Sequence, residues 1–259
     1  MSGAPQFAGL DLARVEEVGL NALQTQRQLF YDGWLLRVSP GKAKRARSVN
    51  AHFGSTLPLA RKIPYCERIY AERGLPTLFR ITPFLQPPDL EAELAGRGYE
   101  AFEPTLVQLV RLDRPPEMPP LAGVEFVTPT PATFAEAVGE IQQTTAEQRA
   151  AYLERMIQSP LATRAVIAMH DGRAVGTGTV MIEDGLAGVF TMGTMPDVRG
   201  RGIATGILAM MLGWAWEHGA THAYLQVSAD NDRAISVYRR FGFADAYTYH
   251  YRGMPGECH

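Results

Sequence analysis

The sequence has little cysteine, little net charge and no apolar run long enough to cross a membrane. Only Cys66 and Cys258 are cysteines among 259 residues, and they lie far apart, so neither a disulfide framework nor a metal site is expected. The formal net charge of −2 argues against a nucleic acid or a membrane as partner of the whole molecule. The most apolar run, residues 202–216, is shorter than the roughly 20 residues of a membrane span. Any charged ligand must therefore be bound locally.

The beginning of the chain lacks the features of a targeting segment. Its first ten residues, MSGAPQFAGL, contain neither the basic region nor the apolar region of a secretory signal. Hydrophobic residues make up 46% of the sequence and charged residues 20%, which is typical of globular proteins. These observations predict a cytoplasmic protein with room for two domains.

A proline-dense segment, RLDRPPEMPPLAGVEF, separates two halves of similar length. Proline removes backbone donors and stiffens the chain, which is typical of a linker. We therefore expect one domain at 1–114, a linker at 115–123 and a second domain at 124–259. The first domain is predicted to begin with a helix at 10–24, strands at 34–38 and 47–52, and a helix at 57–73.

The two halves end in the same order of elements: strand, loop, helix, Gly-aromatic turn and strands. Aligning Gly98-Tyr99 with Gly242-Phe243 places Leu94 opposite Tyr238. We interpret this order as an internal duplication. The alternative is that any strand-helix-strand unit would look similar.

The C-terminal half alternates between strand and helix patterns. Turns at HDGR and EDG join three of its strands into an antiparallel meander. The predicted elements are a strand at 124–128, helices at 131–143 and 145–158, strands at 163–169, 174–183 and 186–195, a helix at 202–218, a strand at 223–228, a helix at 232–241 and closing strands at 243–251. This order predicts an α/β (α+β) fold, a mixed and mostly antiparallel sheet flanked by helices.

The junction TMGTMPDVRGRGIATG, residues 191–206, leads from a strand into a helix. Unpaired N–H groups and the helix dipole make a helix N-terminus an anion site. Gly200 and Gly202 would let the backbone approach an anion and adopt positive φ, while Arg199 and Arg201 add positive charge. We expect a pyrophosphate here; the alternative is a glycine-softened helix start that binds nothing.

This junction and a second segment, LQVSADNDRAISVYRRFGF, resemble two motifs of the GNAT superfamily of acyl-CoA-dependent N-acetyltransferases. The first is similar to the Arg/Gln-x-x-Gly-x-Gly/Ala loop and the second to Asn-x-x-Ala-x-x-x-Tyr-x-x-x-Gly-Phe. The resemblance covers residues 124–252 and implies a GNAT fold. Because both halves end in the same order of elements, we expect a tandem of two GNAT-like halves. It implies acetyl-CoA as cosubstrate and no metal.

The resemblance also implies roles for individual residues. The loop amides would hold the coenzyme A pyrophosphate, the strand before the loop would pair with the pantetheine arm, and a bulge would open that strand from its neighbour. Asn231 would contact the pantetheine amides, cap its helix, or both. The residues implied to bind the cofactor are Met192, Gly193, Thr194, Arg199, Gly200, Arg201, Gly202, Ile203, Ala204, Thr205 and Asn231.

Tyr238 is the implied catalytic residue, because a phenol with a pKa of about 10 can protonate a departing thiolate. Its alternative role is a core residue on a helix face. We assign no general base, because the strand LAGVFTMGTM has no carboxylate. Glu183 and Asp184 fit a hairpin tip, His170 fits a turn, and His250 fits a closing strand.

The amine acceptor is not identified by any motif. We expect its cleft to involve residues 131–158, the tyrosines 247, 249 and 251, and the N-terminal half. That half lacks the glycine-arginine loop and has Leu94 in place of Tyr238, so it is expected to be a degenerate repeat that does not bind the coenzyme and shapes the cleft or a homodimer contact. The basic run KAKRAR fits a solvated loop better than a site that steers an anion.

These features predict an N-acetyltransferase that transfers an acetyl group from acetyl-CoA to a primary amine of a small molecule or peptide by direct attack in a ternary complex. The alternative is a noncatalytic acyl-CoA-binding sensor, which the missing strand carboxylate favours. A nucleic-acid binder using the basic run is disfavoured by the net charge.

Overall fold

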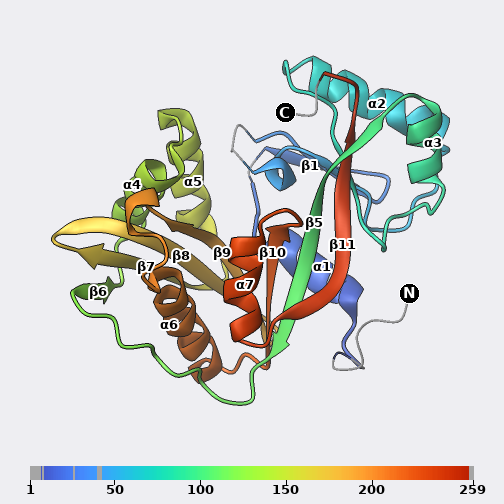
Figure 1. Ribbon diagram of the computed structural model, residues 1–259. Helices are drawn as coiled ribbons and strands as arrows, with labels where there is room; N and C mark the ends of the chain where they lie inside the picture. The colour runs from blue at the N-terminus through green and yellow to red at the C-terminus, as the bar shows by residue number, and fades with distance from the viewer. Residues whose placement is uncertain (1–6, 8, 26, 40–42, 257–259) are drawn as a thin grey trace.

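The computed structural model describes residue 7 and residues 9–25, 27–39 and 43–256. In this part of the chain, eleven strands form a sheet in the order β1-β2-β3-β4-β11-β5-β10-β9-β8-β7-β6 (Figure 1). The N-terminal half contains α1 (Leu12–Asn21), β1 (Gln28–Tyr31), β2 (Trp34–Arg37), η2 (Lys44–Ala46), β3 (Val49–Asn50), α2 (Leu59–Ala71), β4 (Phe79–Ile81), α3 (Leu90–Gly96) and β5 (Glu100–Arg111).

The C-terminal half follows the predicted order of elements closely. It contains β6 (Val124–Val127), α4 (Pro131–Gln142), α5 (Ala146–Gln158), β7 (Ala162–His170), β8 (Arg173–Glu183), β9 (Leu186–Thr194), η3 (Pro196–Val198), α6 (Ile203–Glu217), β10 (His222–Ser228), α7 (Asp232–Arg240) and β11 (Ala244–Gly253). The sheet is mixed: β9–β10 and β3–β4 are parallel and the other pairs are antiparallel, which confirms the predicted fold class.

Two predicted details differ from the structure. β1 was not expected, because four residues before a tight Asp32-Gly33 turn give too short a pattern to recognise. The closing strands around 243–251 are a single strand, β11, whose register against β5 shifts at two places.

The two halves exchange their last strands. β5, from the N-terminal half, lies between β11 and β10, and β11 lies between β4 and β5, so both run side by side through the centre of the molecule (Figure 1). β5 pairs with β10 over seven residue pairs, from His222–Arg111 to Ser228–Thr105. Residues 115–123, the expected linker, lie between β5 and β6, and one sheet crosses the predicted boundary between 1–114 and 124–259.

The halves share one arrangement at their centres. In each, a strand leads into a helix and then into a strand parallel to the first: β3, α2 and β4 in one half, and β9, α6 and β10 in the other. A further helix and a long strand follow, α3 with β5 and α7 with β11. This order agrees with the predicted duplication.

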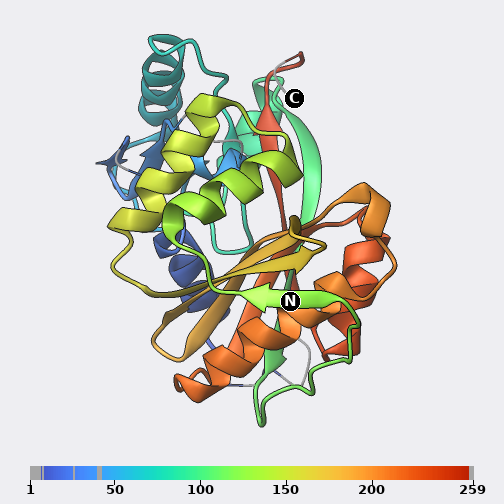
Figure 2. The same cartoon turned by 90° about the vertical axis from the view of Figure 1, so that its left-hand side faces the viewer.

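Helices cover both faces of the sheet. α6 and α7 pack against one face of the C-terminal strands, with Ile207, Met211 and Tyr238 among their core residues. α4 and α5 cover the other face of β7 and β8 (Figure 2). α1 packs against β5, β10 and β11, so it bridges the strands that the halves exchange.

Beneath α1, a buried ion pair of the N-terminal half is joined to the C-terminal half by a hydrogen bond. The Arg80 guanidinium on β4 donates to the Glu16 carboxylate on α1, and the Tyr247 hydroxyl on β11 donates to the same carboxylate at 2.8 Å. Both charged side chains are almost wholly buried. The pair lies where α1, β4 and β11 meet, so it ties the first helix to strands from both halves.

Candidate active site

β9 and β10 diverge halfway along the sheet. They pair from Leu186–His222 to Val189–Leu225, after which β9 remains with β8 and β10 with β5. Thr191 and Met192 form a bulge, because they face the single residue Gly178 of β8. The strands therefore open from this bulge toward the glycine-arginine loop, as the resemblance implies.

The bulge contains a strained residue. Thr191 has a φ of 56°, which is rare for a β-branched residue. The Tyr152 hydroxyl lies 3.1 Å from the Thr191 hydroxyl, and the Thr179 hydroxyl donates to the same oxygen at 3.3 Å. Neighbouring helix α5 and strand β8 thus hold this backbone in a conformation that the sequence alone would not favour.

The loop before α6 has the conformation that its glycines predict. Gly200 has a φ of 81° and Gly202, the N-cap residue of α6, a φ of 82°. No side chain caps this helix end, and the N–H groups of Ile203, Ala204 and Thr205 have no acceptor within the helix. A Cβ at Gly202 would lie 3.1 Å from Leu121 Cδ2. The helix start therefore offers free donors in a turn that excludes most side chains.

A cavity of about 820 Å³ opens along this loop, the end of β9 and α7. Its lining includes all but one of the residues predicted to bind or act on the cofactor: Met192, Gly193, Thr194, Arg199, Gly200, Gly202, Ile203, Ala204, Thr205, Asn231 and Tyr238. Arg201 is exposed and is not part of the lining.

Helix α7 adds two cations that the sequence analysis missed. Arg233 and Arg240 line the same cavity, seven residues apart and thus on one face of the helix. The seven-residue spacing between the two arginines was a signal that could have identified them. The one carboxylate in the loop, Asp197, is paired with Arg173 at 2.7 Å, which lowers the pKa of Asp197. Positive charge therefore prevails around the cavity.

Tyr238 and Asn231 lie at the inner end of this cavity. Tyr238 is 8% exposed, and within the described residues no hydrogen bond engages its hydroxyl. Burial raises the pKa of Tyr238 to about 12, so the phenol keeps its proton at neutral pH. The Asn231 side chain accepts from the Ala234 N–H at 3.2 Å, so it caps α7, one of its two predicted roles.

A second cavity, of about 350 Å³, meets the first. The two share Met192, Asn231, Ala234 and Tyr238. The smaller one is lined by α4, α5, β9 and β10, and from the N-terminal half by Leu23, Ala43 and Arg45. Segment 131–158 and the N-terminal half thus both form this second cavity, as expected of an acceptor cleft.

The three tyrosines of β11 do not line either cavity. They are buried against α1 and β5, and the Tyr247 hydroxyl is engaged by Glu16. Tyr249 has an indirect contact, because its hydroxyl donates to Gln226 Oε1 at 2.9 Å and Gln226 lines the smaller cavity. The structure thus places these three tyrosines away from both cavities, because the strand exchange turns β11 toward the N-terminal half.

No acidic or histidine side chain lines the smaller or the larger cavity in the described part of the chain. Glu183 accepts hydrogen bonds from Arg14 and Asn21 of α1, so it anchors that helix. His170 Nδ1 lies 2.7 Å from the Gly123 carbonyl, and His250 is paired with Glu91 at 3.0 Å. These partners agree with leaving the general base unassigned.

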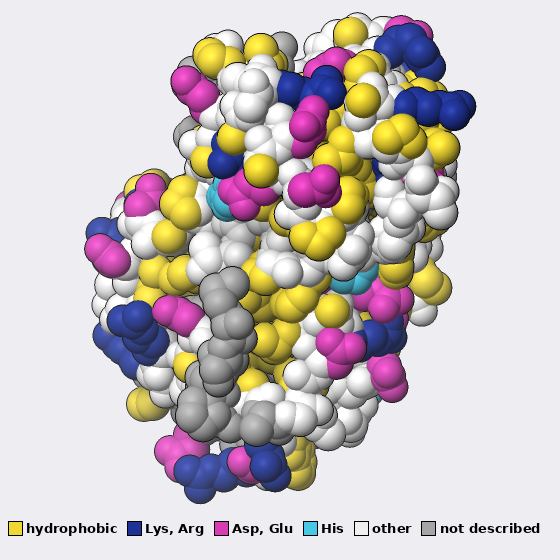
Figure 3. Space-filling view, turned by 90° about the vertical axis from the view of Figure 1, so that its right-hand side faces the viewer, with side chains coloured by type: hydrophobic (Ala, Val, Ile, Leu, Met, Phe, Trp, Pro, Cys, Tyr) yellow, Lys and Arg dark blue, Asp and Glu magenta, His cyan; other side chains and the backbone are white. Residues whose placement is uncertain are grey.

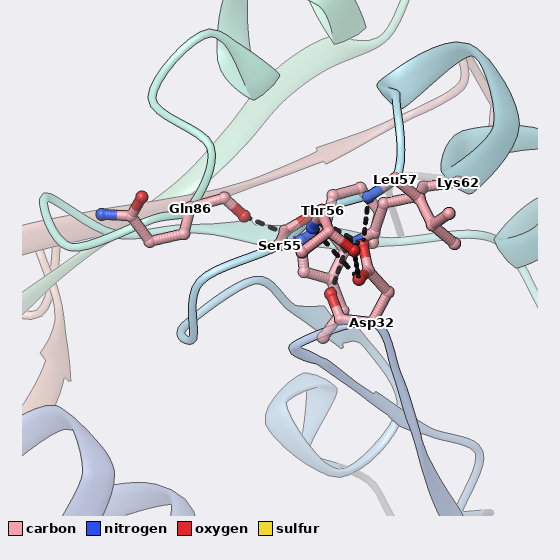
Figure 4. A network of polar contacts seen from close by, with 7 residues as sticks. Asp32, Ser55, Thr56, Leu57, Lys62 and Gln86 are labelled. Atoms are coloured by element: carbon pink, nitrogen blue, oxygen red, sulfur yellow. Dashed lines mark hydrogen bonds and ion pairs between the residues drawn. The ribbon is translucent and has the colours of Figure 1, made fainter.

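The corresponding turn in the N-terminal half is filled by the chain's own carboxylate (Figure 4). Asp32 accepts from the N–H groups of Thr56 and Leu57, from the Ser55 and Thr56 hydroxyls, and from Lys62 Nζ at 3.0 Å. These donors, the Leu57 N–H first, hold the pKa of Asp32 well below its usual value. The donors that precede α2 are therefore already engaged by a side chain of the same half.

Replacing Asp32 by asparagine is expected to lower the thermal unfolding midpoint at pH 7, because Lys62, whose side chain is 0% exposed, loses its counter-charge. A carboxyl with a lowered pKa stabilises the fold above its unfolded pKa and loses this effect as the pH falls. The difference between variant and wild type should therefore narrow below about pH 4. Calorimetry at pH 7 and at a pH below about 4 measures the unfolding midpoints of variant and wild type. The control is Asp89→Asn at the N-cap of α3, whose side chain makes no cap hydrogen bond within the described residues.

Basic side chains are mixed with acidic ones on one face of the molecule, and part of the basic run is engaged within the fold. On the face drawn in Figure 3, basic side chains lie beside acidic ones. Lys44 is paired with Glu103, and Arg45 lines the smaller cavity, so the preference for a solvated loop was wrong for these two residues. Lys42 and Cys258 lie outside the described residues, and Cys66 is a buried free thiol.

Neither a membrane span nor a metal cluster is found among the described residues. No helix there has the length and hydropathy needed to cross a bilayer. No three His, Cys, Asp or Glu side chains gather there in a way that could hold a metal ion.

Comparisons with known proteins identify the family of the C-terminal half. Residues 133–243 match the acetyltransferase (GNAT) family. The chain is 26% identical over 247 residues to the uncharacterized N-acetyltransferase YobR of Bacillus subtilis (strain 168), with 93% of this chain and 98% of that protein covered. The match therefore extends well beyond the two motifs.

Two solved structures share the fold. A GCN5-related N-acetyltransferase from Kribbella flavida has a TM-score of 0.70 at 21% identity and covers 96% of this chain and 97% of its own. A tandem GNAT protein from the clavulanic acid biosynthesis pathway has a TM-score of 0.61 at 19% identity and covers 80% of this chain and 72% of its own. The chain thus carries an acetyltransferase domain of the GNAT family at residues 133–243, within the two-half arrangement of a tandem GNAT fold.

Proposed function

We propose that this protein is an N-acetyltransferase that transfers the acetyl group of acetyl-CoA to a primary amine of a small molecule or peptide. The observation that carries the proposal is the junction of two cavities at Met192, Asn231 and Tyr238. A thioester in the larger cavity and an amine in the smaller one would meet at this junction. Such a meeting places both reactants in one complex, which is the condition for direct attack.

The larger cavity has the features that acetyl-CoA requires. The free N–H groups at the start of α6 suit a pyrophosphate, and Arg199, Arg233 and Arg240 add positive charge around it. The open edge of β9 beyond the bulge at Thr191 suits an extended arm that pairs with main-chain groups. When bound there, acetyl-CoA would supply the activated acyl group.

Direct attack is favoured over a covalent acyl-enzyme. A serine or threonine nucleophile needs an adjacent base, and neither cavity is lined by Asp, Glu or His in the described chain. The amine nitrogen would form the new bond to the acyl carbon as the carbon–sulfur bond breaks. Solvent would take the proton of the amine, the Tyr238 hydroxyl would give a proton to the departing thiolate, and a backbone N–H near Thr194 would donate to the acyl oxygen.

Tyr238→Phe is expected to lower kcat by about 10²-fold, the lower end for loss of a general acid, because a thiolate is already a tolerable leaving group. The dissociation constant of acetyl-CoA should remain unchanged, since the ring and its edge-on contact with Phe243 are kept. Thiol release and calorimetric titration measure the two quantities. Tyr65→Phe, on the remote helix α2, should alter neither. An unchanged kcat in the Tyr238 variant would show that this residue packs in the core and has no catalytic role.

A noncatalytic acyl-CoA sensor is the second candidate, favoured by the lack of an acidic or histidine residue lining either cavity in the described chain. Amine-stimulated thiol release from acetyl-CoA, measured over amino acids, polyamines, aminoglycosides and peptides, separates the two functions. Turnover with any amine supports the transferase. Tight acetyl-CoA binding without stimulation by any amine supports the sensor.

A further inference from the structure

Two arginines line the smaller cavity without a counter-ion. Arg45, on η2 of the N-terminal half, and Arg155, on α5 of the C-terminal half, make no side-chain hydrogen bond and no ion pair within the described residues. One nitrogen of Arg45, Nη1, is fully buried and has no partner. A buried guanidinium donor without an acceptor is costly, so it points to a group that the cavity is built to receive.

A third arginine that lines the smaller cavity has partners for its guanidinium within the fold. Arg149 donates to the Thr144 carbonyl at 2.8 Å and is paired with Glu136 at 3.4 Å. Arg45 and Arg155 are instead held by aromatic rings. The Arg45 guanidinium lies 5.8 Å from the ring centre of Phe190, and that of Arg155 lies 4.9 Å from the ring centre of Tyr152. Such packing positions a guanidinium and leaves its donors available.

The surroundings do not neutralise this charge. No carboxylate lines the smaller cavity in the described chain, and the nearby Glu16 is engaged by Arg80 and Tyr247. Burial, and then the charges of neighbouring arginines, lower the pKa of Arg37; these neighbours are Arg80, Arg45 and Arg155. Arginine stays charged under such conditions, so the wall between the halves has a surplus of positive charge.

We propose that the amine acceptor also carries a carboxylate, so that the acceptor class is a small amino acid, with Arg45 and Arg155 binding the carboxylate and the amine facing Tyr238. This inference rests on the proposed acetyltransferase function. The cavity, at about 350 Å³, has the size of a small-molecule site. A carboxylate presents two oxygens in one plane, which matches the paired donors of a guanidinium.

The same arrangement explains how the amine becomes a nucleophile without a base. Positive charges from Arg45 and Arg155 disfavour a third positive charge, so the bound ammonium group loses its proton to solvent more readily. The carboxylate is held by the arginines, so this repulsion does not expel the substrate. Arg155 also lines a separate cavity of about 520 Å³, whose lining includes the carboxylates of Glu147 and Glu154.

The experiment compares free amino acids with their methyl esters, with the decarboxylated amines and with phosphoethanolamine, measured as thiol release from acetyl-CoA. Wild-type protein should prefer an amino acid to its ester by about 10- to 100-fold in kcat/KM. Arg155→Gln and Arg45→Gln should each lower kcat/KM for the amino acid by a similar factor. They should lower kcat/KM for the ester less, because the ester loses only the effect of the arginines on its ammonium group. Arg68→Gln, on the exposed face of α2, is the charge-matched control.

Several results would overturn the proposal. Equal kcat/KM for ester and amino acid would show that the site does not contact the carboxylate. Equal losses of kcat/KM on both substrates in the variants would show that the two arginines have a structural role only. A preference for phosphoethanolamine would assign the site to a phosphate. If no amine is acetylated, the transferase function fails. Titration of amino acids into the coenzyme A complex then decides the inference: binding lost in Arg155→Gln supports it, and no binding refutes it.

Discussion

Replacing Gly200 and Gly202 together by valine is expected to weaken acetyl-CoA binding by about 10²- to 10⁴-fold, the loss of two or three hydrogen bonds to a charged group. Both glycines have positive φ, where a β-branched residue is strongly disfavoured. At Gly202 a Cβ would also press on Leu121 at 3.1 Å. The turn would rearrange, and the first N–H groups of α6 would no longer point at one anion.

Calorimetric titration of acetyl-CoA measures this loss, with a thermal melt to show that the variant is folded. Gly213→Ala is the matched control on the same helix. A Cβ at Gly213 meets no atom within 4 Å, and alanine in a helix interior should stabilise the protein by about 0.5–1 kcal/mol. A folded valine variant with unchanged affinity would refute the assignment of this turn to the cofactor.

Glu16→Gln is expected to lower the free energy of unfolding by about 3–5 kcal/mol, because it leaves the Arg80 guanidinium buried without a counter-charge. The Glu16 carboxylate is 2% exposed and accepts from both Arg80 and Tyr247. Urea denaturation at pH 7 measures the loss. Glu17→Gln, one residue along α1, removes a partly exposed ion pair with Arg14 and should cost about 1 kcal/mol or less.

The pH dependence of the same pair has a definite sign. Burial raises the pKa of Glu16, but Arg80 outweighs it, and the net pKa is lowered. A carboxyl with a lowered pKa stabilises the fold above its unfolded value of 4.5 and loses this effect as the pH falls through the folded value. The gap between wild type and Glu16→Gln should therefore shrink in acid. A gap that stays constant down to pH values below the unfolded pKa would contradict the role of this ion pair.

The local features of the C-terminal half could be predicted because they depend on neighbouring residues. The pattern of 203–217 defines α6, and the positive φ of Gly200 and Gly202 follows from residue type and context. The bulge at Thr191 was implied by the resemblance, and its strain is visible only where α5 and β8 hold it. The types of neighbouring residues were thus sufficient to predict the local backbone, but they did not predict which distant elements hold it.

The sequence by itself determined the order of elements in the C-terminal half, the glycine turn before α6 and the placement of Tyr238 on a helix face, because each depends on residues within a few turns of one another. Only the tertiary structure decided that β5 and β11 change places, that Asp32 fills the turn before α2, and that Arg45 and Arg155 face one cavity. Those contacts join residues separated by 23 to 153 positions. Hydrophobic periodicity shows which face of an element is buried, and it does not show which distant element covers that face.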